Sequence, residues 1–226
     1  MRLSVIVPTL DEEATIASTL AHARRPGDVE LVVVDGGSRD ETVNVARPLA
    51  DRVLDAPRGR AAQMNAGAAA ARGAVLLFLH ADTRLPDDYP ALVAEALAPA
   101  DVVGGRFDIR LDAPGLAYRV IERLIGLRSR LTGVATGDQA IFVRRDAFER
   151  VGGYREVPLC EDLDLVGRLG GLGRFSLVDA SVETSPRRWE KNGVSRTIAL
   201  MWALRLGYHL GVSPSTLRRF YGNEPR

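Results

Sequence analysis

Several features that mark other classes of protein are scarce in this chain. Its 226 residues include a single cysteine, Cys160, so no internal disulfide can form and we expect a reducing compartment. The 30 basic and 29 acidic residues leave a formal net charge of +1. Because binding to a polyphosphate needs an excess of positive charge, this balance argues against nucleic acid as a partner.

Long apolar runs are also missing. The N-terminal run stops at Pro8 and has neither the apolar core nor the small-residue cleavage site of a signal peptide. The longest other candidate, residues 198–212, is interrupted by Arg205 and His209 and is too short for a membrane span. We therefore expect a cytoplasmic protein, with a peripheral place on the inner face of the cell membrane as the alternative.

What the sequence does contain is an alternation of apolar strands and helices, and 46% hydrophobic residues can fill a sizeable core. The predicted strands are residues 3–7, 30–34, 52–54, 74–79, 102–109, 140–143 and 175–178. The predicted helices are residues 12–24, 40–46, 60–72, 114–131, 161–169, 194–210 and a last one that starts at Ser213-Pro214. Continuous apolar strands separated by helices predict an α/β fold with a mostly parallel sheet covered on both faces.

Polar side chains follow three of the apolar strands. Thr9 comes after the first strand, Asp35 ends the second, and His80-Ala81-Asp82 follows the 74–79 strand. Ligands of such sheets bind beyond the carboxyl ends of the strands, so we expect a ligand site at this edge.

Asp35 and the segment His80-Ala81-Asp82 can each be interpreted in two ways, as functional or as structural. Asp35 can accept hydrogen bonds from a base or a ribose, or it can belong to a helix-capping loop. Asp82 offers the hard oxygen ligands that magnesium or manganese prefers, and His80 could add an imidazole nitrogen. The alternative is an ordinary turn after the strand, in which Asp82 caps a helix and His80 packs.

Further candidates lie later in the chain. Glu161 and Asp162 are paired carboxylates at a helix start, where they can favour the helix dipole or supply a general base. The sites around Arg60 and Arg187 present guanidinium groups that suit a diphosphate, although a short basic run can equally be solvated surface. Cys160 is interpreted as a small buried residue rather than a nucleophile.

The order and spacing of these segments resemble family 2 glycosyltransferases, over roughly residues 2–189. Residues 8–13 are similar to the P-T-x-N-E-E segment of that family, and residues 34–42 to its V-D-D-G-S-x-D-x-T segment. Residues 80–82 stand at its D-x-D position, Glu161-Asp162 at its later E-D pair, and residues 187–189 loosely match Q-x-x-R-W. Gly36 and His80 depart from the family pattern, since each replaces an acidic residue. Details of the later motifs resemble a small bacterial subgroup of transferases.

The resemblance implies a GT-A (Rossmann-like) fold and a set of roles. The nucleotide-sugar, a UDP- or GDP-sugar, would be bound by Pro8, Thr9, Leu10, Glu12, Asp35, Arg60, Asn65, Ala81 and Asp82. Mn²⁺ or Mg²⁺ would be held by Asp82 and His80, and the diphosphate would be met by Arg187, Arg188 and Trp189. The general base would be Asp162, and the acceptor side would comprise Gly137, Asp138, Gln139 and Glu161.

The expected function is an inverting, metal-dependent transfer to an unknown acceptor hydroxyl, with a lipid-linked or lipophilic acceptor as one option. A nucleotidyltransferase is disfavoured, because the loop after the first strand has neither glycine nor lysine. A non-catalytic sugar-nucleotide-binding module at a membrane surface stays open.

The chain divides by pattern into residues 1–190, a GT-A domain, and residues 191–226, a helical appendage. Within the domain, residues 1–110 would bind the nucleotide-sugar and residues 111–190 the acceptor. The appendage is interpreted as helices packed on the core or on a second copy in a homodimer. A helix lying in a membrane interface, with Trp202 at headgroup level, is the alternative.

Overall fold

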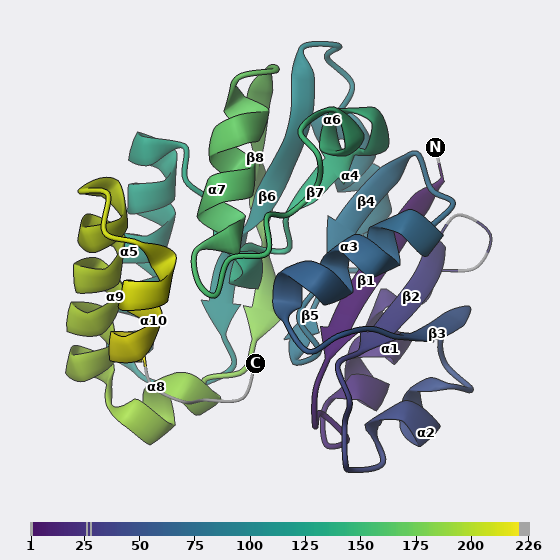
Figure 1. Ribbon diagram of the computed structural model, residues 1–226, viewed down its shortest axis with the longest axis horizontal. Helices are drawn as coiled ribbons and strands as arrows, with labels where there is room; N and C mark the ends of the chain where they lie inside the picture. Colours follow the sequence, from purple (N-terminus) through teal and green to yellow (C-terminus); the bar gives the residue numbers. More distant parts are fainter. Residues whose placement is uncertain (1, 26, 28, 222–226) are drawn as a thin grey trace.

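One sheet with helices on both faces organises most of the protein (Figure 1). The computed structural model describes residues 2–25, 27 and 29–221, apart from the side chains of Arg188, Asn192, Val194, Ser195 and His209. The strands are β1 (Leu3–Thr9), β2 (Val29–Asp35), β3 (Arg52–Asp55), β4 (Val75–Phe78), β5 (Thr83–Arg84), β6 (Val102–Leu111), β7 (Phe142–Arg144) and β8 (Arg174–Thr184). The helices are α1 (Ile16–Ala23), α2 (Thr42–Ala46), α3 (Arg60–Ala70), α4 (Tyr89–Ala96), α5 (Leu116–Thr132), η1 (Gly137–Gln139), α6 (Arg145–Arg150), α7 (Glu161–Gly170), α8 (Arg187–Asn192), α9 (Val194–His209) and α10 (Pro214–Tyr221).

The strands lie in the order β3-β2-β1-β4-β7-β6-β8-β5. The pairs β3–β2, β2–β1, β1–β4 and β6–β8 are parallel. The strand β7 is antiparallel to both of its neighbours, and β5 is antiparallel to β8. The predicted α/β fold with a mostly parallel, mixed sheet is thus confirmed.

Successive residues of β1 pack into two separate hydrophobic cores, one on each face of the sheet. Val5 and Val7 face one side with Leu20 of α1, whereas Ile6 faces the other side with Met64 of α3. The contrast follows from the alternation of side chains along a strand. Burying each such side chain contributes about 1.5–3 kcal/mol, which explains why the strands read as continuous apolar runs.

Helix α3 approaches β1 especially closely through Gly67. A Cβ added to Gly67 would collide with Cγ2 of Ile6, so no larger residue fits there. Helix α3 begins at Arg60, which contacts His80 just after β4. Sequence and packing together therefore position a cation at the predicted ligand edge.

Several boundaries differ from the prediction. Helix α1 begins at Ile16 rather than at residue 12, because the backbone N–H of Glu12 bonds the Thr42 hydroxyl and residues 12–15 form a turn. Helix α4 was not predicted. Pro90 near its start hides the helical pattern, although proline is tolerated in a first turn.

The C-terminal helices gather with α5 on one side of the molecule, away from β3 (Figure 1). Leu204 of α9 and Leu217 of α10 form a small core with Leu159 and Cys160, so the cysteine is a buried apolar residue as interpreted. Among the described helices, none combines the length and apolar character needed to cross a membrane.

Candidate active site

The loops after β1 and β2 are joined by reciprocal hydrogen bonds at the carboxyl edge. The backbone N–H of Asp11 donates to the Ser38 hydroxyl at 2.9 Å, and the N–H of Arg39 donates to Asp11 Oδ1 at 2.8 Å. Asp11 has a φ of 53°, in the left-handed region that aspartate and asparagine tolerate best after glycine. Aspartate can therefore replace the asparagine of the P-T-x-N-E-E pattern without changing the loop.

Asp35 is 3% exposed and organises its own loop. Its Oδ2 accepts the backbone N–H groups of Gly37 and Ser38, both at 2.8 Å, and its Oδ1 accepts the Ser38 hydroxyl at 2.5 Å. The Thr9 hydroxyl also donates to Oδ1, at 3.3 Å. The structure thus brings Thr9 and Asp35 together, and the carboxylate stabilises the turn after β2 without capping a helix.

Gln63 of α3 belongs to this edge and was missed by the sequence analysis. Its Nε2 donates to the carbonyl oxygens of Thr9 at 2.8 Å and of Val34 at 2.9 Å, so one buried amide links the ends of β1 and β2. A Cβ on Gly36 would lie 3.0 Å from the Gln63 side chain. Glycine at position 36 therefore leaves room for the Gln63 side chain. The one available signal was a lone polar residue in an alanine-rich helix.

Arg60 connects the end of β4 with the start of α7. Its Nη2 donates to Nε2 of His80, and its Nε lies 3.4 Å from Oε1 of Glu161, which is 5% exposed. In this arrangement Nε2 of His80 faces a guanidinium group. A hollow lined in part by Arg58, Arg60, Glu161 and Arg218 opens beside this contact.

Asp162 lies next to Glu161 at the first turn of α7. Its Oδ2 accepts the backbone N–H of Gly137 at 2.7 Å, and its Oδ1 accepts the N–H of Leu163 at 2.8 Å. Burial, together with the negative charge of Glu161, raises the pKa of Asp162 to about 6, although the two N–H donors and Arg60 act in the opposite direction. A carboxyl group with this pKa changes its charge close to neutral pH.

The remaining acceptor-side residues lie in and around η1. Gln139 is fully buried, and its Oε1 accepts the backbone N–H of Thr136 at 3.1 Å, so it shapes the turn. Oδ1 of Asp138 is buried and has no hydrogen-bond partner among the described residues. The turn therefore presents the Gly137 backbone to Asp162, and Asp138 follows it in the same turn.

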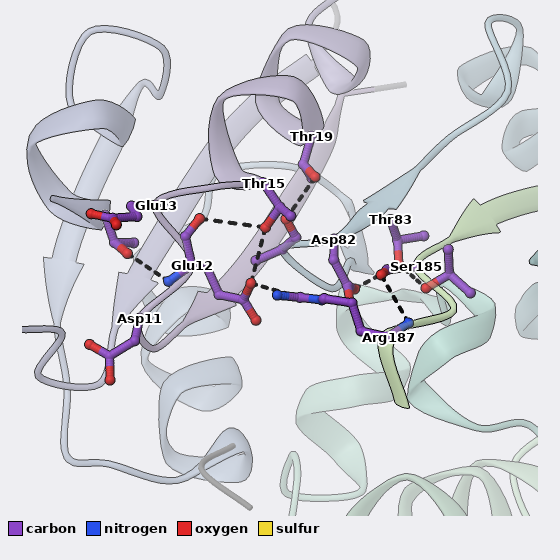
Figure 2. A network of polar contacts seen from close by, with 12 residues as sticks. Asp11, Glu12, Glu13, Thr15, Thr19, Asp82, Thr83, Ser185 and Arg187 are labelled. Carbon is purple, nitrogen blue, oxygen red and sulfur yellow. Dashed lines mark hydrogen bonds and ion pairs between the residues drawn. The ribbon is translucent and has the colours of Figure 1, made fainter. Parts of the chain in front are cut away.

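A third group of predicted residues forms an ion-pair bridge (Figure 2). Nη2 of Arg187 lies 2.9 Å from Oε2 of Glu12 and 2.9 Å from Oδ2 of Asp82. The backbone N–H of Ser185 donates to the carbonyl oxygen of Asp82 at 3.3 Å, which ties the end of β8 to this point. Three segments far apart in the sequence thus meet at the carboxyl edge.

Other predicted residues serve different contacts. The Asn65 amide pairs with the backbone of Tyr154 through bonds of 2.8 and 2.9 Å. Pro8 and Ala81 belong to the backbone of the edge: Pro8 lies in β1, and the carbonyl of Ala81 accepts the Thr19 hydroxyl at 2.8 Å. Leu10 follows β1 and is partly buried.

The structure says less about the remaining diphosphate residues and about the predicted metal site. Trp189 is a partly buried residue of α8, and the side chain of Arg188 lies outside the described residues. Within those residues, no group of three or more His, Cys, Asp or Glu side chains is arranged to hold a metal. A cation at Asp82 would therefore need oxygen ligands from a bound substrate as well.

Comparison with known proteins gives a consistent result. Residues 4–152 match the family description Glycosyl transferase family 2. The PGL/p-HBAD biosynthesis glycosyltransferase of Mycobacterium bovis (strain BCG / Pasteur 1173P2) is 35% identical over 167 residues, which are 67% of this chain and 62% of that protein. The undecaprenyl-phosphate 4-deoxy-4-formamido-L-arabinose transferase of Pseudomonas fluorescens is 33% identical over 157 residues, which are 63% of this chain and 46% of that protein. The chain thus spans between about half and three fifths of the length of these relatives.

Solved structures extend the comparison to the fold. The mannosyltransferase PcManGT from Pyrobaculum calidifontis, in complex with GDP-Man and Mn²⁺, has a TM-score of 0.72 at 22% identity, and the match covers 100% of this chain and 66% of that one. S. aureus TarS 1-349 in complex with UDP-GlcNAc has a TM-score of 0.62 at 19% identity, covering 82% and 58%. These likenesses support the GT-A fold expected from the sequence.

Proposed function

This chain belongs to glycosyl transferase family 2, and we propose that it transfers a sugar from a UDP- or GDP-sugar to an acceptor hydroxyl, with inversion at the anomeric carbon. The observation that carries the proposal is Asp162, a carboxyl group with a pKa of about 6 that is fixed by the N–H of Gly137 at the ligand edge. A base with this pKa is largely ionised at neutral pH and can still accept a proton. In the proposed reaction Asp162 takes the proton of the acceptor hydroxyl as that oxygen attacks.

The donor would lie across the ends of β1, β2 and β4. Gln63 and Asp35 hold the loops after β1 and β2 in place, so the edge is formed before the donor arrives. Arg60, fixed by His80 and Glu161, would face the donor as a cation. Preorganisation of this kind supports catalysis because little rearrangement remains for the reaction itself.

A divalent cation fits the chemistry of this edge. The carboxylate of Asp82 is a hard oxygen ligand, and diphosphate oxygens would complete the coordination that Mn²⁺ or Mg²⁺ needs. Such a cation, when bound, would neutralise the diphosphate leaving group. The Mn²⁺ present in the PcManGT complex supports this part of the proposal by analogy.

A lipid-linked acceptor is the acceptor class we propose. One relative is named as an undecaprenyl-phosphate transferase, which points to a phosphorylated lipid as the substrate of that protein. The hollow beside Glu161 is lined by Arg58, Arg60 and Arg218, and guanidinium groups suit a phosphate. The hollow therefore supports an acceptor with an anionic phosphate, which the guanidinium groups would hold while a separate hydroxyl group of the acceptor reacts at Asp162, the neighbour of Glu161.

Exposed apolar helix faces support peripheral contact with a membrane. One face of α5 carries five side chains between 46% and 78% exposed, Leu116, Val120, Leu124, Leu127 and Leu131. Trp202 and Leu206 of α9, and Leu210 directly after it, are 59–74% exposed, while Leu204 of α9 is buried. A helix that is apolar on its packed and its exposed faces is normally covered on both, and a lipid surface would cover the second.

The domain division stays part of the proposal. Residues 1–190 would bind donor and acceptor, and residues 191–226 would form the appendage that faces the lipid. The contact of α9 and α10 with Leu159 and Cys160 places the described part of this appendage next to the start of α7. Flotation with vesicles of anionic lipid tests the membrane contact, with Leu124→Glu/Leu127→Glu as the variant expected to lose it. If the protein stays with the bulk solution and sediments as a dimer, those faces cover a second copy instead.

The transfer itself is tested with a panel of UDP- and GDP-sugars, Mn²⁺ or Mg²⁺, and phosphorylated lipid or simple alcohol acceptors. We expect one donor to be consumed, with release of the nucleoside diphosphate and a product of inverted anomeric configuration by NMR. Formation of a nucleoside triphosphate and a sugar 1-phosphate when pyrophosphate is supplied in place of the acceptor would indicate a nucleotidyltransferase, and donor binding without turnover would indicate a binding module. Either result would overturn the proposal.

A further inference from the structure

The side chains of three residues that lie far apart in the sequence meet at one place: Glu12, Asp82 and Arg187 (Figure 2). A single nitrogen of Arg187, Nη2, is 2.9 Å from a carboxylate oxygen of each acidic residue. One positive group therefore stands between two negative groups that face the same position. The point between the two carboxylates is therefore also suited to a metal cation.

Each carboxylate has a further contact besides Arg187: for Asp82, its Oδ1 accepts the Thr83 hydroxyl at 3.4 Å. The backbone N–H of Glu12 donates to the Thr42 hydroxyl at 2.7 Å, and Oε2 of Glu12 accepts the Thr15 hydroxyl at 3.0 Å. Asp82 follows β4, and its side chain is 21% exposed, close to the 24% of Glu12. The acidic pair is thus part of the sheet edge and has contacts besides those to the arginine.

Arg187 is the most exposed of the three side chains. Its side chain is 50% exposed, and it begins α8, a six-residue helix that comes directly after β8 and the connecting residues 185–186. A half-exposed ion pair contributes little to stability, because water screens it. The guanidinium can therefore leave the acidic pair at small cost.

In this structure Nε2 of His80 faces Arg60 rather than the position shared by Glu12 and Asp82. Nε2 of His80 accepts a hydrogen bond from Arg60. Glu12, in contrast, directs its Oε2 to the same position as Oδ2 of Asp82. Magnesium and manganese are held in nucleotide sites by one or two carboxylates together with phosphate oxygens, which matches this pair.

We propose that Glu12 joins Asp82 in holding the divalent cation, and that Arg187 is an internal cation which occupies their position until metal and donor replace it. The inference rests on the proposed function, since the cation is the one that accompanies the nucleotide-sugar. On displacement, Arg187 exchanges two carboxylate partners for the oxygens of the diphosphate, to which a guanidinium binds well. Metal and donor would then bind more tightly together than apart.

The test measures Mn²⁺ binding by the intensity of the free-Mn²⁺ EPR signal, first without nucleotide and then with UDP or GDP. Glu12→Gln and Asp82→Asn are each expected to weaken Mn²⁺ binding by about tenfold or more. Glu13→Gln is the matched control: Oε2 of the neighbouring Glu13 accepts the backbone N–H of Glu41 at 3.0 Å and does not face Arg187. It should bind Mn²⁺ as the unchanged protein does.

For Arg187→Met we expect tighter Mn²⁺ binding. A folding defect would weaken binding, so it could not produce this result. Without nucleotide, this variant should bind Mn²⁺ several-fold more tightly than the unchanged protein, and the gain should disappear when Glu12→Gln is added. Unchanged Mn²⁺ affinity in Glu12→Gln would overturn the assignment of Glu12, and no gain in Arg187→Met would overturn the exchange. If the metal results hold but no donor is turned over, the cation site stands and the proposed transfer falls.

Discussion

The backbone N–H of Gly137 donates a hydrogen bond of 2.7 Å to Oδ2 of Asp162, which holds the proposed base against the turn after α5. A Cβ on Gly137 would lie 2.8 Å from Nε2 of His80 and 2.9 Å from Nη2 of Arg60. The turn therefore packs backbone directly against the charged group around Arg60. A side chain at this position must displace His80 or Arg60, or shift the turn whose N–H holds Asp162.

Gly137→Ala should accordingly lower the rate of sugar transfer by at least about tenfold and cost about 1–3 kcal/mol of stability through overpacking. Gly167→Ala, inside α7, is the control because a Cβ there meets nothing within 4 Å. It should retain activity and gain about 0.5–1 kcal/mol from helix propensity. Initial rates and thermal unfolding of both variants check the prediction. Equal activity of the two would show that the turn does not position the base.

The pH dependence of transfer should follow the ionisation of Asp162. Since the base acts only when deprotonated and its pKa is about 6, kcat/KM should fall as the pH drops through about 6. Glu161→Gln removes a negative charge that raises this pKa, so the acid limb of the profile should move to lower pH. A limb that moves to higher pH, or not at all, would contradict the assigned cause.

The same raised pKa predicts a stability effect with a definite sign. The folded protein holds the Asp162 proton more tightly than the unfolded chain, in which an aspartate has its ordinary pKa of 3.8, so this residue lowers stability as the pH rises from about 4 through 6. Asp162→Asn should therefore be more stable than the unchanged protein at pH 8, by about 1–3 kcal/mol. The difference should shrink toward zero near pH 4. Urea unfolding at several pH values measures it.

The contact between Gly36 and Gln63 can be tested by a double-mutant cycle. Gly36→Ala should destabilise the protein because its Cβ would meet the Gln63 side chain at 3.0 Å. Gln63→Ala should cost about 1–3 kcal/mol, since it leaves two buried carbonyl oxygens without their shared donor. In the Gln63→Ala background, Gly36→Ala should cost measurably less than it does alone. Additive effects would show that the two residues do not interact.

Much of the fold could be predicted because its first strands are buried on both faces. The runs around β1, β2 and β4 are continuously apolar, and the polar residues that end them mark the ligand edge. The short helices α4 and α6 could not be predicted in the same way, because six to eight residues give too little periodicity. Packing on the sheet, rather than the local sequence, forms them.

The site could be predicted as a set of residues but not as a set of contacts. The order of motifs indicated Asp35, Asp82 and Asp162, and these assignments stay predictions of function. No local pattern indicates that His80 turns to Arg60, or that the Asn65 amide pairs with Tyr154, 89 positions later in the chain. Those contacts depend on loops whose paths are set by the whole fold.

The central claim is that Asp162 is the base of a nucleotide-sugar transfer, and one variant tests it directly. Asp162→Asn should fold and should bind its donor with Mn²⁺ as tightly as the unchanged protein does, by isothermal titration. Its turnover of the same donor should fall by about 10²–10⁴-fold, the usual contribution of a general base. An Asp162→Asn protein that binds the donor and transfers the sugar at the unchanged rate would contradict the account.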